Sequence, residues 1–177
     1  QMSSDSIQKL LNDPRFQETL AEIAGNKNIP LPKIEKEARG YLKELYTEHA
    51  PLADMVAVQM AEYVLGRGYE TTIDTNDEEM RRLARLMRKS SVAFVMTHKT
   101  YIDMFVLGVT LARHGLPLPY TFAGINMSFM GLGQFGRQSG AIFIRRSFKD
   151  NPVYKATLRA FIAHLVDQKS HFMWAIE

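Results

Sequence analysis

His98 and Asp103 are the pair of residues in this sequence best suited to moving a proton. An apolar run, residues 92–96, ends shortly before His98, and Thr100 is placed to cap the helix that follows. Asp103 would then lie in the first turn of that helix, where its carboxylate can fix the imidazole tautomer and stabilise the imidazolium. The spacing indicates a general base with an orienting acid, and it also suits a helix cap beside a solvated histidine.

Two arginines follow a second apolar run. Residues 141–144 are apolar, and Arg145 and Arg146 come directly after them, with Arg137 upstream and Lys149 downstream. Guanidinium groups bind oxyanions through paired hydrogen bonds, and ligands of open α/β sheets collect at the carboxyl ends of strands. This pattern predicts a phosphate clamp. The same cations also suit a solvated strand end, lipid headgroups or a nucleic-acid backbone.

The elements that must position these side chains alternate between strand and helix in the second half of the chain. Strands are expected at residues 92–96, 120–123, 141–144 and 171–176, with a β-like stretch at 71–74, and helices at residues 77–89, 101–113 and 152–169. Because helices separate the strands, the pattern indicates βαβ units and a largely parallel sheet. The run at 92–96 is typical of a strand buried on both faces.

The first half of the chain carries a helical pattern instead. Asp13 before Pro14 is an N-cap signal, and apolar residues recur at helical spacing. Three helices are expected, at residues 14–24, 32–45 and 51–66, each opened by a proline. We therefore expect an α/β protein with an N-terminal helical bundle (residues 1–69) and an α/β sheet domain (residues 70–177).

Composition and charge narrow the classes of function. Of the 177 residues, 46% are apolar and none is cysteine, so the chain can bury a core but cannot form disulfides, cysteine-bound zinc or a thiol nucleophile. Residues 1–79 contain 8 Lys and Arg against 15 Asp and Glu, a net charge of −7, whereas residues 80–177 contain 14 against 4, a net charge of +10. The basic half predicts an anionic partner: a phosphorylated small molecule, an anionic membrane or nucleic acid.

Membrane insertion is not expected from the sequence. The start of the chain lacks a signal-peptide pattern. The longest uncharged run, residues 116–136, contains too many Pro and Gly residues to form a spanning helix. A peripheral membrane contact is the form of association that stays open.

Three segments, taken together, resemble one enzyme family. They are Thr97 to Asp103 (THKTYID), Ala123 to Met127 (AGINM) and Gly140 to Lys149 (GAIFIRRSFK). In this order and at these separations they are similar to the glycerol-3-phosphate acyltransferases of the bacterial PlsB type and the related dihydroxyacetone-phosphate acyltransferases. The resemblance runs over residues 91–177. It departs from the family at Glu177, which matches only the first residue of the third motif, Glu-Gly-Thr-Arg, so we expect a piece of a longer enzyme.

The resemblance implies a fold, a reaction and a set of site residues. The fold would be a helical bundle followed by a partial glycerophosphate acyltransferase-type sheet domain. His98 would deprotonate the 1-hydroxyl of glycerol 3-phosphate for attack on an acyl thioester, with Asp103 orienting it, and Arg145 and Arg146 would hold the phosphate. Further substrate-binding candidates are Arg137, Lys149 and Glu177. The donor would be acyl-CoA or acyl-carrier protein, and no metal or cofactor would be needed.

The resemblance also implies where in the cell the protein acts, and it leaves alternative functions open. The protein would catalyse the first step of phospholipid synthesis as a peripheral protein on the cytoplasmic face of the membrane, without binding nucleic acid. Residues 122–135 would line an acyl channel, dip into the membrane surface or pack as an ordinary short helix and loops. One alternative is an acyltransferase acting on dihydroxyacetone phosphate or lysophosphatidate. The other is a noncatalytic basic module that binds anionic membrane or nucleic acid through Arg81, Arg82, Arg85 and Arg88.

Overall fold

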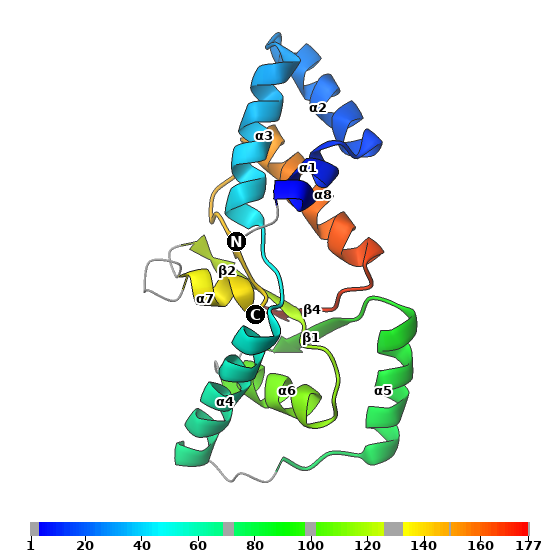
Figure 1. The fold of residues 1–177 in the computed structure, drawn as a ribbon, viewed down its shortest axis with the longest axis vertical. Helices are drawn as coiled ribbons and strands as arrows, with labels where there is room; N and C mark the ends of the chain where they lie inside the picture. Colours follow the sequence, from blue (N-terminus) through cyan, green and yellow to red (C-terminus); the bar gives the residue numbers. More distant parts are fainter. Residues whose placement is uncertain (1–3, 69–72, 98–101, 126–132, 149, 177) are drawn as a thin grey trace.

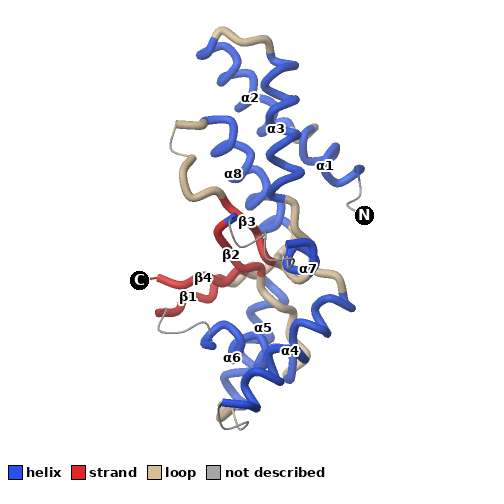
Figure 2. The backbone as a smooth tube through the Cα atoms, turned by 90° about the vertical axis from the view of Figure 1, so that its left-hand side faces the viewer, coloured by secondary structure: helices blue, strands red, loops and turns tan. Residues whose placement is uncertain are grey.

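The computed structural model of the chain describes residues 4–68, 73–97, 102–125, 133–148 and 150–176. Within these ranges the chain forms eight helices and four strands, with the sheet in the middle of an elongated molecule (Figure 1). Helices α1, α2, α3 and α8 lie on one side of the sheet, and α4, α5 and α6 lie on the other (Figures 1 and 2). This is the mixed α/β fold that the sequence predicts.

The predicted helices of the first half are all present. They are α2 (Pro14–Lys27), α3 (Leu31–Leu45) and α4 (Pro51–Gly68). Asp13 caps α2 as predicted, because its carboxylate accepts hydrogen bonds from the backbone N–H groups of Arg15 and Phe16 at 2.9 and 3.2 Å. A further helix, α1 (Ser4–Leu11), is not among the predictions, although its buried Ile7, Leu10 and Leu11 have helical spacing.

All four predicted strands form one parallel sheet. They are β1 (Ala93–Thr97), β2 (Tyr120–Gly124), β3 (Ala141–Ile144) and β4 (Phe172–Ile176), in the order β1-β4-β2-β3. Each neighbouring pair is parallel, so the α/β prediction is confirmed. The β-like stretch at 71–74 is not a strand where it is described, because Ile73 and Asp74 belong to no sheet.

Four helices accompany the sheet: α5 (Asp77–Lys89), α6 (Ile102–Arg113), α7 (Gly133–Gln138) and α8 (Pro152–Asp167). Side-chain caps start two of them. Asn76 accepts hydrogen bonds from the N–H groups of Glu78 and Glu79 at the start of α5, and Asn151 accepts one from Tyr154 at the start of α8. Helix α7 begins near the end of the run at 122–135, so that run includes a short helix in its described part.

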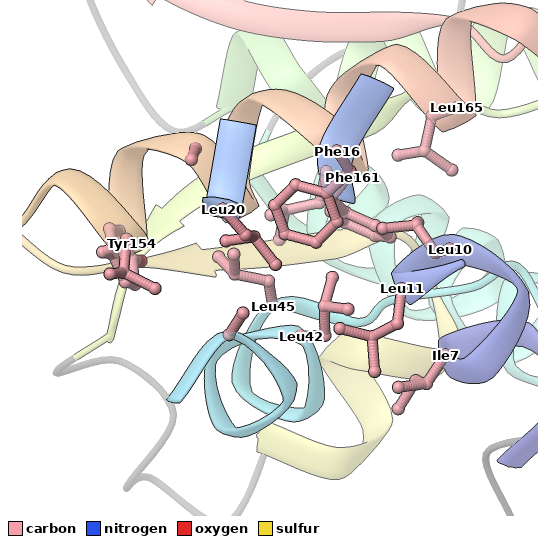
Figure 3. Close-up of a cluster of buried hydrophobic side chains, with 14 of the residues drawn as sticks. Ile7, Leu10, Leu11, Phe16, Leu20, Leu42, Leu45, Tyr154, Phe161 and Leu165 are labelled. Carbon is pink, nitrogen blue, oxygen red and sulfur yellow. The ribbon is translucent and has the colours of Figure 1, made fainter. Parts of the chain in front are cut away.

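One hydrophobic core joins the N-terminal helices to the sheet domain. Figure 3 shows side chains from α1, α2, α3 and α8 gathered in a single cluster. Leu20, Leu42, Leu45 and Phe161 are fully buried in it, and burial of each such side chain stabilises the fold by about 1.5–3 kcal/mol. The cluster also includes Ile142 of β3. The core therefore draws on residues from both sides of position 70, and the domain boundary predicted there stays a prediction.

The prediction that β1 is buried on both faces is wrong, because Ala93, Val95 and Thr97 are exposed on one face, and within the described sheet β1 is an edge strand. Val95 is 51% exposed, and its register partner on β4, Trp174, is 39% exposed. Both side chains are apolar, and the described residues leave them partly uncovered. An apolar run does not distinguish a central strand from an edge strand, because the neighbours of a strand come from distant parts of the sequence.

His171 is a buried histidine at the start of β4. It is 4% exposed, and its Nδ1 accepts a hydrogen bond from the backbone N–H of Val92 at 3.2 Å. Burial lowers the pKa of His171 below its usual value of 6.5. The folded protein therefore keeps this ring neutral at pH values at which the unfolded chain binds a proton.

We expect the free energy of unfolding to fall as the pH drops below 6.5, because the unfolded state then binds the additional proton at His171. His171→Asn keeps an acceptor for the Val92 N–H and cannot titrate. Urea unfolding of both proteins at several pH values below 6.5 should show a smaller loss of stability in the variant. His164, whose pKa burial also lowers, and Asp13, whose pKa is lowered by its hydrogen bonds at the start of α2, contribute to the slope that persists. Equal slopes in the two proteins would contradict the assignment.

Candidate active site

The two strands that carry the predicted motifs end at the same edge of the sheet. Strand β1 ends at Thr97, the residue before His98, and β3 ends at Ile144, the residue before Arg145. Because the strands are parallel, both ends lie at the carboxyl edge, with β4 and β2 between them. Three strand spacings separate β1 from β3, about 14 Å. A phosphorylated substrate held by a long arginine side chain spans such a distance, and this edge is where open α/β sheets bind ligands.

Three of the predicted site residues, His98, Lys149 and Glu177, lie outside the described residues. Their described neighbours locate the ends of the strands. Ile176, the last residue of β4, pairs in register with Thr97 of β1. The last residues of β1 and β4 thus lie side by side. The roles of the three residues stay predictions.

Asp103 lies in the first turn of α6, as its role as an orienting acid requires. Helix α6 is held from the N-terminal region by α4. Ala61 and Leu65 of α4 pack with Val109 of α6 in a small apolar cluster, and Glu62 pairs with Arg113 at 3.0 Å. Helix α4 therefore positions the helix that carries Asp103.

Arg145 is held by a carboxylate from helix α3. Its Nε donates a hydrogen bond to Oε1 of Glu44 at 2.7 Å, and its Nη2 donates one to Oε2 at 2.6 Å. The guanidinium also lies over the rings of Tyr41 and Tyr154, at 5.0 and 5.3 Å from their centroids. The hydrogen bonds to Glu44 raise the pKa of Arg145 still further, so it stays charged. Sequence reasoning missed Glu44, because no local pattern links residues that are 101 positions apart.

Arg146 has a different environment from its neighbour. Its side chain is exposed, and it forms no ion pair with any carboxylate in the described part of the chain. Of the two arginines after β3, Arg146 is thus the one without a described counter-charge. This is the environment expected of a side chain that binds a phosphate from solution.

Arg137 lies in α7 and contacts the protein itself. Its guanidinium donates a hydrogen bond to the backbone carbonyl of Glu44 and lies 5.1 Å from the centroid of the Phe143 ring. Burial lowers the pKa of Arg137. These contacts connect α7 to α3 and β3, and the predicted part of Arg137 in substrate binding stays a prediction.

Gly140, the first residue of the arginine motif, has a packing role that the sequence did not reveal. Its φ is 85°, and a Cβ atom at this position would lie 2.4 Å from Nε2 of His49. His49 packs edge-on against Tyr120 at 4.5 Å, and its Nδ1 lies 2.8 Å from Oδ1 of Asp54. Its Nε2 is buried without a hydrogen-bond partner among the described residues. The motif glycine is therefore needed for close packing against an imidazole.

The His49–Asp54 pair has the same sequence spacing as His98 and Asp103, and both acids lie in the first turn of a helix. The 2.8 Å contact shows that this spacing at a helix start brings an imidazole and a carboxylate together. However, His49 packs on Tyr120 and Gly140, at the amino ends of β2 and β3. It lies at the opposite edge of the sheet from the arginines, with its Nε2 covered, so we interpret it as structural.

The described residues contain no cluster that could bind a metal ion, and a large groove among them lies away from the carboxyl edge. No group of three or more His, Asp or Glu side chains in the described ranges lies close enough together to hold a metal ion. A groove of about 770 Å³ runs between α2 and α8, where Phe16, Ile23, Lys155 and Arg159 are among its lining residues. It contains none of the predicted site residues.

Together, the fold and the motif positions define an α/β protein with a candidate anion site at the carboxyl edge of a parallel sheet. Comparison with known families identifies the class further. The family model described as Acyltransferase matches residues 74–177, more than half of the chain. The chain belongs to the acyltransferase family.

Relatives with curated names extend the similarity to the N-terminal helices. The "Putative acyltransferase plsB1" proteins of Mycobacterium tuberculosis and Mycobacterium bovis are 33% identical over 175 residues, which is 97% of this chain and 27% of theirs. The "Glycerol-3-phosphate acyltransferase" of Haemophilus ducreyi is 30% identical over 157 residues, which is 89% of this chain and 19% of that protein. The chain thus spans between about a fifth and about a quarter of the length of these relatives.

Proposed function

We propose that the protein transfers a fatty acyl group from a thioester to the 1-hydroxyl of glycerol 3-phosphate. The observation that carries this proposal is the common carboxyl edge at which the histidine motif and the arginine motif follow β1 and β3. The family supports acyl transfer, and the name of the Haemophilus ducreyi relative supports glycerol 3-phosphate as the acceptor. The donor is acyl-CoA or acyl-carrier protein.

In the proposed reaction His98 removes the proton from the 1-hydroxyl while the oxygen attacks the thioester carbonyl carbon. The new C–O bond forms and the C–S bond breaks. The proton passes from the imidazolium to the departing thiolate, so the products are 1-acylglycerol 3-phosphate and a free thiol. Asp103 fixes the tautomer of His98 and stabilises its charged form, and Arg146 binds the acceptor phosphate. Lys149 and Glu177 are further proposed contacts of the substrate.

Release of free thiol from an acyl-CoA, followed with a thiol-reactive dye, tests this function in the full-length protein. Glycerol 3-phosphate should stimulate release, and dihydroxyacetone phosphate and lysophosphatidate, supplied separately, should stimulate it less. A preference for either of these acceptors would change the substrate but keep the reaction. No acceptor-dependent release with either acyl-CoA or acyl-carrier protein would overturn the proposal.

Arg146→Ala is expected to raise the KM for glycerol 3-phosphate by about 10- to 100-fold, because it removes charge-assisted hydrogen bonds to the phosphate. The KM for the acyl donor should change little. Arg159→Ala is the matched control, since Arg159 is an exposed arginine of α8 and is none of the predicted site residues. An unchanged KM for the acceptor in Arg146→Ala would show that the phosphate binds elsewhere.

We further propose that the protein associates peripherally with the cytoplasmic face of the membrane. No helix in the described ranges is both long and apolar enough to cross a bilayer. Helix α5 supports a surface contact, because Arg81, Arg82, Arg85 and Arg88 are all exposed and form no described ion pair. Binding to phosphatidylglycerol vesicles that weakens with added salt would support this proposal, and binding to duplex DNA alone would favour the nucleic-acid alternative.

A further inference from the structure

The Glu44–Arg145 pair is the centre of a network that joins three elements at the carboxyl end of β3. Glu44 belongs to α3, Arg145 follows β3, and Tyr154 belongs to the first turn of α8. The Tyr154 hydroxyl accepts a hydrogen bond from the backbone N–H of Arg145 at 3.1 Å. Asn151 donates from its side chain to the hydroxyl of Tyr41 at 2.7 Å. Both the side chain and the backbone of Arg145 are therefore held.

The environment of Arg145 suits an internal contact better than a phosphate site. Its Nε and Nη2 donors are both directed to one carboxylate, which is only 18% exposed. The negative charge of Glu44 already neutralises the positive charge of Arg145 that would attract a phosphate. The guanidinium of Arg145 also lies over the aromatic rings of Tyr41 and Tyr154. By contrast, the next residue, Arg146, is exposed and has no described counter-charge.

We propose that Arg145 is a positioning residue whose ion pair with Glu44 fixes the end of β3 so that Arg146 is presented to the acceptor phosphate. This inference rests on the proposed function. Because the two arginines are consecutive, holding the backbone at Arg145 restricts the directions available to the Arg146 side chain. Glu44 lies outside residues 74–177, the part matched by the family model. Through this carboxylate the N-terminal helix α3 thus acts on the proposed phosphate site.

A direct role and a positioning role of Arg145 predict opposite effects of a change at Glu44. If Arg145 binds the phosphate itself, removing the negative charge of Glu44 frees its guanidinium, and the acceptor binds as well as before or more tightly. If the ion pair fixes the end of β3, removing the charge of Glu44 breaks the pair while Arg145 keeps its own charge, and the acceptor binds more weakly.

The experiment compares Glu44→Gln with Arg145→Met in the full-length protein. We expect each variant to raise the KM for the phosphorylated acceptor by about tenfold, because each removes the ion pair. In the double variant Glu44→Gln/Arg145→Met the rise should not exceed that of Arg145→Met, since the pair can be lost only once. The KM for the acyl donor should be unaffected in all three. If Arg145→Met does not fold, Arg145→Lys replaces it, because lysine keeps the charge and loses the bidentate geometry.

Asp167→Asn is the matched control. Asp167 forms an exposed ion pair with Arg15 at 3.2 Å between α8 and α2, in the same helical cluster and away from the motif strands. Its KM values should match those of wild type. A wild-type or lower acceptor KM in Glu44→Gln, together with a raised acceptor KM in Arg145→Met, would overturn the inference and assign Arg145 to the phosphate. Wild-type KM values in both single variants would also overturn it.

The proposed function and this inference fail in different ways. The acceptor in these assays is whichever of glycerol 3-phosphate, dihydroxyacetone phosphate or lysophosphatidate the wild-type protein uses. An inactive wild-type protein would overturn the proposed function and, with it, the role toward phosphate. An active wild-type protein whose acceptor KM does not rise in Glu44→Gln would overturn the inference alone.

Discussion

Replacing His98 by alanine is expected to lower kcat of the full-length protein by about 10³-fold or more, with little change in its thermal stability. The hydroxyl of glycerol 3-phosphate is a poor nucleophile while it keeps its proton. Without the imidazole the proton passes to a weaker or less well placed base such as water, so positive charge builds up on the attacking oxygen as the C–O bond forms. Thiol release at saturating acceptor and donor measures this effect directly. The KM values should change much less than kcat, because the role proposed for His98 is toward the reacting atoms.

His114→Ala provides the control for this substitution. His114 follows the end of α6 and is exposed, and its Nδ1 lies 2.8 Å from the carbonyl oxygen of Thr110. Its removal should leave kcat within about twofold of wild type, as for an ordinary surface position. A His98→Ala variant with near-native kcat would show that another group removes the proton.

Gly140→Ala is expected to destabilise the fold by about 2–5 kcal/mol, the largest stability effect that we predict for a single methyl group. Two causes act together. Residues other than glycine adopt a φ of 85° only with strain, and the new Cβ would overlap the His49 ring, at 2.3 Å from Cε1. The ring has little room to move, because it lies between Tyr120 and the hydrogen bond to Asp54. Urea or thermal unfolding measures the loss.

Gly115→Ala separates the two causes. Gly115 also has a positive φ, 64°, but a Cβ there meets no atom within 4 Å. It should therefore cost only the conformational part, about 1–2 kcal/mol. In the double variant Gly140→Ala/His49→Ala the loss should be smaller than the sum of the two single losses, because the overlap is gone. Equal losses in Gly140→Ala and Gly115→Ala would show that His49 moves aside without cost.

The Gly140 result would also divide the arginine motif into two functions. Its glycine lies at the amino end of β3 and is explained by packing against His49. Its arginines lie at the carboxyl end, where substrate is proposed to bind. One contiguous motif thus combines a requirement of the fold at one edge of the sheet with a requirement of binding at the other.

Much of the fold follows from short-range signals in the sequence. Asp13, Asn76 and Asn151 cap helices where their side chains can reach free backbone N–H groups, and those groups lie within three residues. Strands β1 and β3 could be predicted for the same reason. Each is marked by an apolar run of four or five residues, and that run lies within the strand itself. Helix α1 was missed although it has a local signal, and the exposure of β1 was missed because its neighbours are distant.

The candidate site shows the limit of such signals. His49–Asp54 and His98–Asp103 have the same residue types, the same spacing and the same position near a helix start. Only the direction of the strands separates them, since His49 packs at the amino ends of β2 and β3 and His98 follows the carboxyl end of β1. A spacing specifies which groups can meet locally, and the sheet specifies which edge they face.

By itself, the sequence determined the helices, the strands, their α/β alternation and the motif residues, because each depends on groups only a few positions apart. The tertiary structure decided that Arg145 pairs with Glu44 and that Arg146 remains exposed. It also decided that α4 supports the helix of Asp103. These contacts join residues far apart in the chain, and their energy is realised only when the helices pack against the sheet and bury the groups that form them.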